Sequence, residues 1–175
     1  MEIPYFQIDA VTDTVFGGNP AGVCLLDDWL PAETMQAIAL ENNLSETVFL
    51  VADGDDYGIR WFTPTVEIDL AGHPTLAAGS LVLTRLDPGR AAVTFISPLG
   101  DVPTVTREDD RFAMDFSARP PEHRDGVDAI GPALGATPDE ALASRDGFAV
   151  FADANKLCAK LKRRRQFCEA SVMGG

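Results

Sequence analysis

The chain has 175 residues, of which 46% are hydrophobic and 23% charged, enough for one globular domain or for one domain and an incomplete second one. Its net charge of −13 argues against nucleic-acid binding, which needs a basic surface, and against anionic membrane surfaces. No apolar run approaches the roughly 20 residues that span a bilayer, and the start shows no signal peptide, so we expect a cytoplasmic protein.

The first 117 residues are predicted to form short strands and two helices. Residues 17–20, Gly-Gly-Asn-Pro, are typical of a turn. Helices are predicted over residues 31–42, where Pro31 suits a first turn, and over 74–86, where apolar and small side chains recur at helical spacing. Apolar and alternating runs predict strands at residues 4–10, 21–26, 47–51, 57–63, 91–97, 102–106 and 111–116.

This order predicts an α+β fold in which a curved, mostly antiparallel sheet wraps a central helix. The small residues Ala77-Ala78-Gly79-Ser80 would let the sheet close tightly around the second helix. We therefore assign residues 1–117 to one domain.

The remainder of the chain divides into three predicted parts. Residues 118–126 are polar and proline-rich, as in a linker. Residues 127–155 resemble the start of an incomplete second domain, with helical pieces at 127–134 and 138–143 and a strand at 148–151.

The last twenty residues differ in charge from the rest of the chain. Residues 1–155 contain no Lys and carry 26 acidic residues against 8 Arg, a net charge of −18, whereas residues 156–175 carry +5. We interpret this basic tail as the product of a frameshift or other truncation. The alternative is a natural basic tail that binds an acidic partner.

Two motifs contain candidate catalytic residues. Glu46, in Ser45-Glu46-Thr47, precedes an apolar run, and partial burial there would suit a general acid/base; a solvated surface residue is the alternative. Gly72-His73-x-Thr75 opens the second helix, where the glycine admits a ligand, the helix start attracts anions and His73 can move a proton. The alternative there is a helix start with a structural histidine.

Other conspicuous residues have structural interpretations. Core packing best explains the aromatic segment Trp61-Phe62-Thr63-Pro64. Cys24 is best interpreted as a small, buried apolar side chain. The three cysteines have neither disulfide-framework nor metal-ligand spacing, and no motif for a metal or an organic cofactor is present.

Taken together, the segments GNPAGV, LSETVF and RWFTPTVEIDLAGHPTLAAGSLVL resemble, in order and spacing, the phenazine biosynthesis-like (PhzF-like) isomerase/epimerase family over residues 3–117. The resemblance implies a diaminopimelate-epimerase-like fold of two pseudo-symmetric domains with the active site between them. It also implies that Glu46 is the catalytic acid/base. The implied substrate-binding residues are Asn19, Gly72, His73 and Thr75.

The resemblance further implies an isomerase or epimerase that moves a proton on a small carboxylic acid without a metal or cofactor, and a homodimer is common in the family. Related epimerases carry a catalytic Cys where this chain has Ala71, which excludes a two-thiol mechanism at that position. Family members are longer, and their Asp-x-x-Thr-Gly-Ser segment is absent here, so we expect impaired activity. The alternative is a non-catalytic, truncated binding or dimerising module.

Overall fold

The computed structural model describes residues 2–100, 102–115, 118, 120–123, 131, 134–144 and 147–153. The chain divides into two compact units, Met1–Phe116 and Ser117–Gly175, and each is described by itself below.

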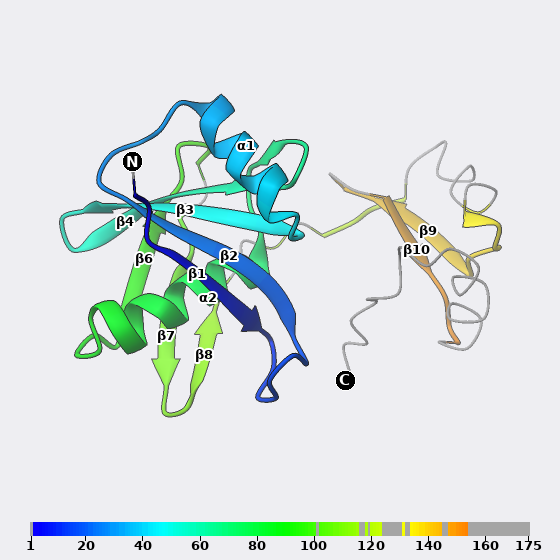
Figure 1. The fold of residues 1–175 in the computed structure, drawn as a ribbon. Helices are drawn as coiled ribbons and strands as arrows, with labels where there is room; N and C mark the ends of the chain where they lie inside the picture. Colours follow the sequence, from blue (N-terminus) through cyan, green and yellow to red (C-terminus); the bar gives the residue numbers. More distant parts are fainter. Residues whose placement is uncertain are drawn as a thin grey trace. The chain divides into compact units, whose positions relative to one another are not determined.

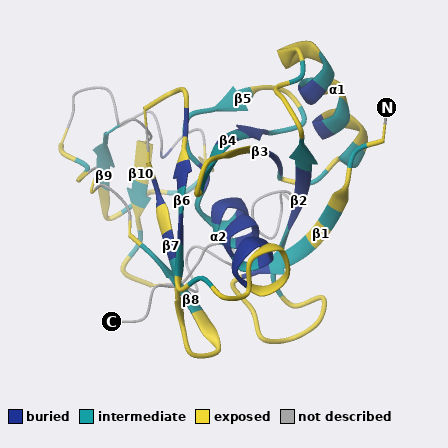
Figure 2. Cartoon of the chain, turned by 90° about the vertical axis from the view of Figure 1, so that its left-hand side faces the viewer, coloured by how far each residue is buried: buried dark blue, intermediate teal, exposed yellow. Residues whose placement is uncertain are grey.

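The first unit is one eight-stranded sheet around a buried helix (Figures 1 and 2). The strand order is β1-β2-β3-β4-β6-β7-β8, with β5 paired to β4. Only the β2–β3 and β4–β6 pairs are parallel, so the predicted α+β fold with a mostly antiparallel sheet is confirmed. The strands are β1 (Tyr5–Ala10), β2 (Asn19–Leu26), β3 (Glu46–Asp53), β4 (Asp56–Phe62), β5 (Glu67–Ile68), β6 (Ala92–Ile96), β7 (Thr104–Glu108) and β8 (Arg111–Met114).

Helix α2 (Gly72–Leu81) runs through the middle of the curved sheet, and Figure 2 shows it dark blue inside the ring of strands. Pro74 falls in its first turn, where the missing N–H costs no intrahelical hydrogen bond. The sequence predicted one helix over residues 74–86. Instead, the α-helix begins two residues earlier and passes at Val82–Leu86 into a π-helical segment, η1, whose first two residues remain buried.

The close fit between α2 and the sheet depends on Gly79. A methyl group at this position would lie 2.5 Å from Cγ1 of Val105 on β7, and β-branched Val105 has little freedom to turn away. We expect Gly79→Ala to lower the free energy of unfolding by about 1–2 kcal/mol, because the overlap outweighs the better helix propensity of Ala.

Urea unfolding of Gly79→Ala, Val105→Ala and the double variant measures this effect. The double variant should lose less stability than the sum of the two single losses, because truncating Val105 makes room for the new methyl group. A Gly79→Ala protein more stable than the parent would show that β7 has room to move.

A second, smaller core lies on the other face of the sheet, under helix α1 (Ala32–Asn42). Along β3, Val48 and Leu50 belong to the core around α2, while Phe49 between them belongs to the core under α1. Strand β3 is therefore buried on both faces, which explains its continuous apolar sequence. The second core consists of Cys24, Met35, Ala39, Phe49 and Phe62.

Burial controls the chemistry of Cys24. Its side chain is 1% exposed, and desolvation raises the pKa of the thiol from 9.0 to about 12. We expect Cys24 to resist iodoacetamide at pH 8 in the folded protein and to react in urea. Peptide mass mapping distinguishes it from Cys158 and Cys168, and rapid alkylation of folded Cys24 would contradict its burial.

The raised pKa of Cys24 also makes the free energy of unfolding depend on pH. The unfolded thiol ionises near pH 9, whereas the folded thiol keeps its proton until about pH 12. The folded state thus binds more protons over this interval, and the contribution of Cys24 is intact below pH 9 and is lost as pH rises towards 12. Cys24→Ala should show a flatter decline in unfolding free energy over the same interval.

Two sequence expectations in this unit need correction. Asn19 and Pro20 were predicted to lie in a turn, but they begin β2, where they pair with Ala10 and Asp9 of β1. Pro20 is tolerated there because it precedes the first residue of β2 that pairs with β3, Ala21. The two-residue strand β5 was not predicted, since it is too short to produce a periodic pattern.

In the second unit, β9 (Glu140–Ala143) and β10 (Gly147–Val150) form an antiparallel pair, and Glu122 bridges to Ala143. The helix predicted over residues 138–143 is therefore wrong, because strand pairing overrides a weak local helical pattern. The strand predicted at 148–151 is present, displaced by one residue. Most of the helix predicted at 127–134, and the whole tail 156–175, lie outside the described residues.

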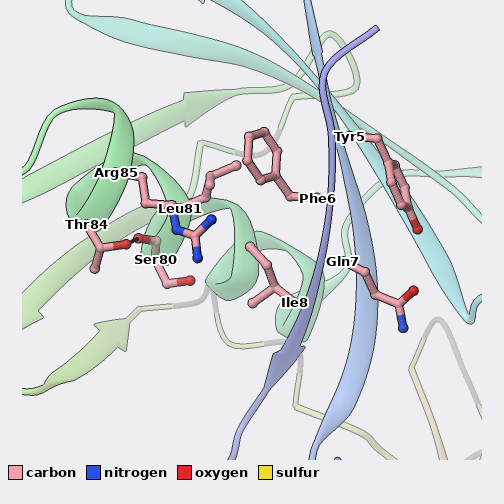
Figure 3. Close-up of a pocket in the computed structure, with 8 residues that line it drawn as sticks. All are labelled: Tyr5, Phe6, Gln7, Ile8, Ser80, Leu81, Thr84 and Arg85. Atoms are coloured by element: carbon pink, nitrogen blue, oxygen red, sulfur yellow. Dashed lines mark hydrogen bonds between the residues drawn. The ribbon is translucent and has the colours of Figure 1, made fainter. Parts of the chain in front are cut away.

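Of the helices in the described residues, none is long and apolar enough to cross a bilayer. A pocket of about 410 Å³ lies between β1, an edge strand of the sheet, and the end of α2 with Thr84 and Arg85 of η1 (Figure 3). Phe6 and Ile8 face the helix there, while Tyr5 and Gln7 extend from the other side of the strand. None of the predicted site residues lines this pocket, so its presence does not bear on the candidate site.

Candidate active site

Three chain segments meet where the predicted site residues lie. Strands β2 and β3 are parallel, so both begin at the same end of the sheet, with Ala21 opposite Glu46. Asn19 begins β2 and Glu46 begins β3. His73, in the first turn of α2, lies at the same end of these strands, as its contact with Glu46 shows.

The turn between α1 and β3 fixes the direction of Ser45 and Glu46. Asn43 ends α1 in the left-handed conformation, with φ 51°, and its N–H donates to Ala39 O at 3.1 Å. The side-chain amide of Asn42 donates to Thr47 Oγ1 at 3.1 Å, which ties the end of the helix to the start of β3.

Four side chains form a connected polar cluster. Nε2 of His73 lies 3.3 Å from Oε2 of Glu46 and 3.4 Å from Oγ of Ser45. The Ser45 hydroxyl donates to Oδ1 of Asn19 at 3.3 Å. Because that hydroxyl uses its single hydrogen on Asn19, it can only accept from His73, which places a proton on Nε2.

Glu46 is the chemically unusual member of this cluster. Its side chain is 18% exposed, yet its Oε2 is buried and makes no hydrogen bond within the described part of the chain. The 3.3 Å contact with His73 has the separation of an ion pair but not the geometry of a hydrogen bond. A buried carboxylate oxygen that lacks a hydrogen bond is costly unless another group completes it, and it is well placed to accept a proton.

The start of α2 supplies donors beside this carboxylate. The N-cap residue, Ala71, has no polar side chain, and α2 has no side-chain cap. The N–H of Gly72 is at the first position of the helix, where no residue of the helix can accept its hydrogen bond, and Pro74 has no N–H at all. Such a helix start attracts a negatively charged group.

Thr75 has a different environment from the other predicted site residues. Its side chain is fully buried, and its hydroxyl donates to Ala71 O at 2.6 Å and accepts from Nε1 of Trp61 at 2.8 Å. The hydroxyl is thus not open to a ligand. The sequence favoured core packing for Trp61, and the structure adds the buried hydrogen bond from its indole N–H to Thr75.

Ser45 belongs to this cluster as well, although the sequence did not predict it as a site residue. Its presence beside Glu46 in Ser45-Glu46-Thr47 was the signal available. Among the described residues, no three His, Cys, Asp or Glu side chains gather closely enough to hold a metal ion.

Residues 8–125 match the family model of the phenazine biosynthesis-like proteins, PhzC-PhzF. This chain belongs to that family. The family resemblance inferred from the three motifs is therefore confirmed.

Individual relatives agree with this assignment. An uncharacterized isomerase of Pseudomonas aeruginosa is 46% identical over 159 residues, which cover 91% of this chain and 61% of that protein. A PhzF-family crystal structure from Enterococcus faecalis matches with TM-score 0.77 and 39% identity over 93% of this chain and 64% of that one. A "predicted epimerase" of Pseudomonas aeruginosa matches with TM-score 0.53 and 25% identity over 68% of this chain and 46% of that one.

The epimerase-like fold expected from the sequence is confirmed by these structures. The chain spans about three fifths of the length of the first curated relatives, 61% and 59%.

Proposed function

We propose that this chain carries the acid/base of a proton-transfer isomerase, and that Glu46 moves a proton on a small carboxylic acid. The observation that supports this most directly is the buried Oε2 of Glu46, which lacks a hydrogen bond and lies 3.3 Å from His73. The isomerase and epimerase descriptions of the relatives support the same reaction class.

In this proposal the start of α2 holds the carboxylate of the substrate, because the amino-terminal end of a helix attracts anions. Glu46 takes a proton from a carbon near that carboxylate, and the electron pair of the broken C–H bond moves into the adjacent π system. The same carboxyl group returns the proton to another carbon, so atoms and electrons balance without a co-reactant. His73 orients Glu46, Ser45 orients His73, and Asn19 orients Ser45.

A single base distinguishes this reaction from a two-base racemisation. The residue before Gly72 is Ala71, whose methyl group cannot exchange a proton. Because one carboxyl group both removes and returns the proton, part of the transferred hydrogen should come from the substrate itself rather than from solvent. We also place the activity in the cytoplasm, a proposal that fits the free thiol of Cys24.

Deuterium incorporation in heavy water tests the proposal. The chain is incubated with small 2-amino and β,γ-unsaturated carboxylic acids, and proton NMR with mass spectrometry follows carbon-bound deuterium. We expect at least one acid to gain deuterium at a carbon near its carboxylate. If no acid exchanges faster than with chain denatured in urea, the proposal is wrong, and the non-catalytic alternative predicts self-association in size-exclusion chromatography instead.

A further inference from the structure

We infer that Trp61 and Thr75 are positioning residues that set the contact between His73 and Glu46. The catalytic meaning of this inference rests on the proposed function, but the contact itself does not. Both side chains are fully buried, so neither can reach a substrate directly.

The positioning device is a chain of two hydrogen bonds with a fixed direction. The indole N–H of Trp61 donates to Thr75 Oγ1 at 2.8 Å, and the Thr75 hydroxyl donates to Ala71 O at 2.6 Å. Trp61 is only a donor, so Thr75 must accept from it and has its single hydrogen left for Ala71. The indole N–H of Trp61 and the hydroxyl of Thr75 thus both have hydrogen-bond partners.

These bonds enclose the turn that carries His73. Ala71 precedes Gly72 and His73, and Thr75 follows them, so the bond between Ala71 and Thr75 ties together the two ends of the turn. This tie matters because α2 has no side-chain cap, and the adjacent Gly72 has the widest backbone freedom of any residue.

Trp61 then fixes the turn relative to Glu46. Trp61 lies on β4 opposite Val48 of β3, and Val48 is two residues after Glu46 on the same strand. The β3–β4 ladder therefore connects the base to the indole N–H that holds the helix start. Loss of either hydrogen bond would change the 3.3 Å distance between Nε2 of His73 and Oε2 of Glu46.

A second attachment holds the other end of the segment that enters α2. Strand β5 pairs with β4, and Arg60 donates to both carboxylate oxygens of Glu67 at 2.6 and 2.7 Å. The Arg60 guanidinium also lies over the rings of Phe62 and Trp29, at 5.3 and 5.7 Å from their centres. The hydrogen bond to Glu67 raises the pKa of Arg60, so the guanidinium keeps its charge.

Only three residues, 69–71, separate β5 from α2. Because β5 is held at one end of this short segment and Ala71 at the other, the position of the first turn of α2 is restrained. Thr75→Val keeps the shape of the side chain but removes the hydroxyl, which breaks the side-chain bond to Ala71 O and leaves the buried Trp61 N–H without its acceptor.

A double-mutant cycle read by NMR tests the inference without a substrate. The Hε1 chemical shift of His73 is measured at fixed pH, with His123 as the internal reference and His123→Gln for assignment. Glu46→Gln should move the His73 signal in the parent, because it changes the charge beside the ring. In the Thr75→Val background the same substitution should move it by less than half as much, and Thr75→Ser should restore the full displacement.

A matched control separates positioning from general loss of stability. Leu81→Ala truncates a buried side chain at the far end of the same helix and should leave the response of His73 to Glu46→Gln unchanged. Trp61→Phe provides a second route to the same hydrogen bond if Thr75→Val does not fold, and should weaken the response as Thr75→Val does.

An undiminished response in Thr75→Val or Trp61→Phe would overturn the inference, as would an equal reduction in Leu81→Ala. Because this readout needs no turnover, it is independent of the deuterium-exchange test. Exchange that depends on Glu46 combined with an undiminished NMR response would reject only the positioning role. A lost response in a chain that catalyses no exchange would reject only the proposed function.

Discussion

Glu46→Gln should reduce deuterium incorporation into any acid that the parent chain exchanges by roughly 100- to 10,000-fold, the usual contribution of a positioned general acid/base. The amide keeps the size of the side chain but cannot accept and return a proton at the position of the buried Oε2. The initial rate of carbon-bound deuterium gain, compared at equal concentrations of folded protein, measures the effect.

Glu41→Gln is the matched control for this prediction. It makes the same chemical change five residues earlier, at an exposed position on α1, and should leave the exchange rate unchanged. Glu46→Asp withdraws the carboxylate by one methylene group and should retain a small part of the rate, because proton transfer depends on close approach. Equal exchange by Glu46→Gln and Glu41→Gln would remove Glu46 from the mechanism.

The sequence predicted three of the four residues of the polar cluster because they lie in short motifs whose order and spacing resemble those of the family. Asn19, Glu46 and His73 were selected from three separate segments, and the structure brings them into one cluster through Ser45. What the sequence could not predict was the direction of each side chain. Thr75 was expected to bind substrate, whereas its hydroxyl turns into the core towards Trp61.

The fold was predictable wherever one local pattern decided the element. The apolar run of β3 and the small residues of α2 are examples, since each reflects the burial of several consecutive residues. Predictions failed where distant pairing decided the outcome. Asn19 and Pro20 have turn chemistry but pair with β1, and residues 140–143 form β9 because β10 pairs with them.

The largest stability effect is expected from Phe49→Ala, which should lower the free energy of unfolding by about 3–5 kcal/mol. Phe49 is fully buried under α1 and packs edge-on against Phe62, with ring centres 5.5 Å apart. Removing its ring leaves a cavity between α1 and the sheet, because the surrounding strands hold their positions. Urea unfolding followed by the fluorescence of Trp29 and Trp61 measures the loss.

Leu40→Ala is a suitable comparison, since Leu40 lies on α1 but is 59% exposed, and it should change stability by no more than about 0.5 kcal/mol. Phe49→Ala should also weaken the site, because α1 ends at Asn42, three residues before Ser45. A helix that packs less firmly would hold the start of β3 less firmly, and the contact of Glu46 with His73 would loosen with it. A loss below 1 kcal/mol in Phe49→Ala would show that α1 can settle into the space of the ring, and the site would then not depend on this core.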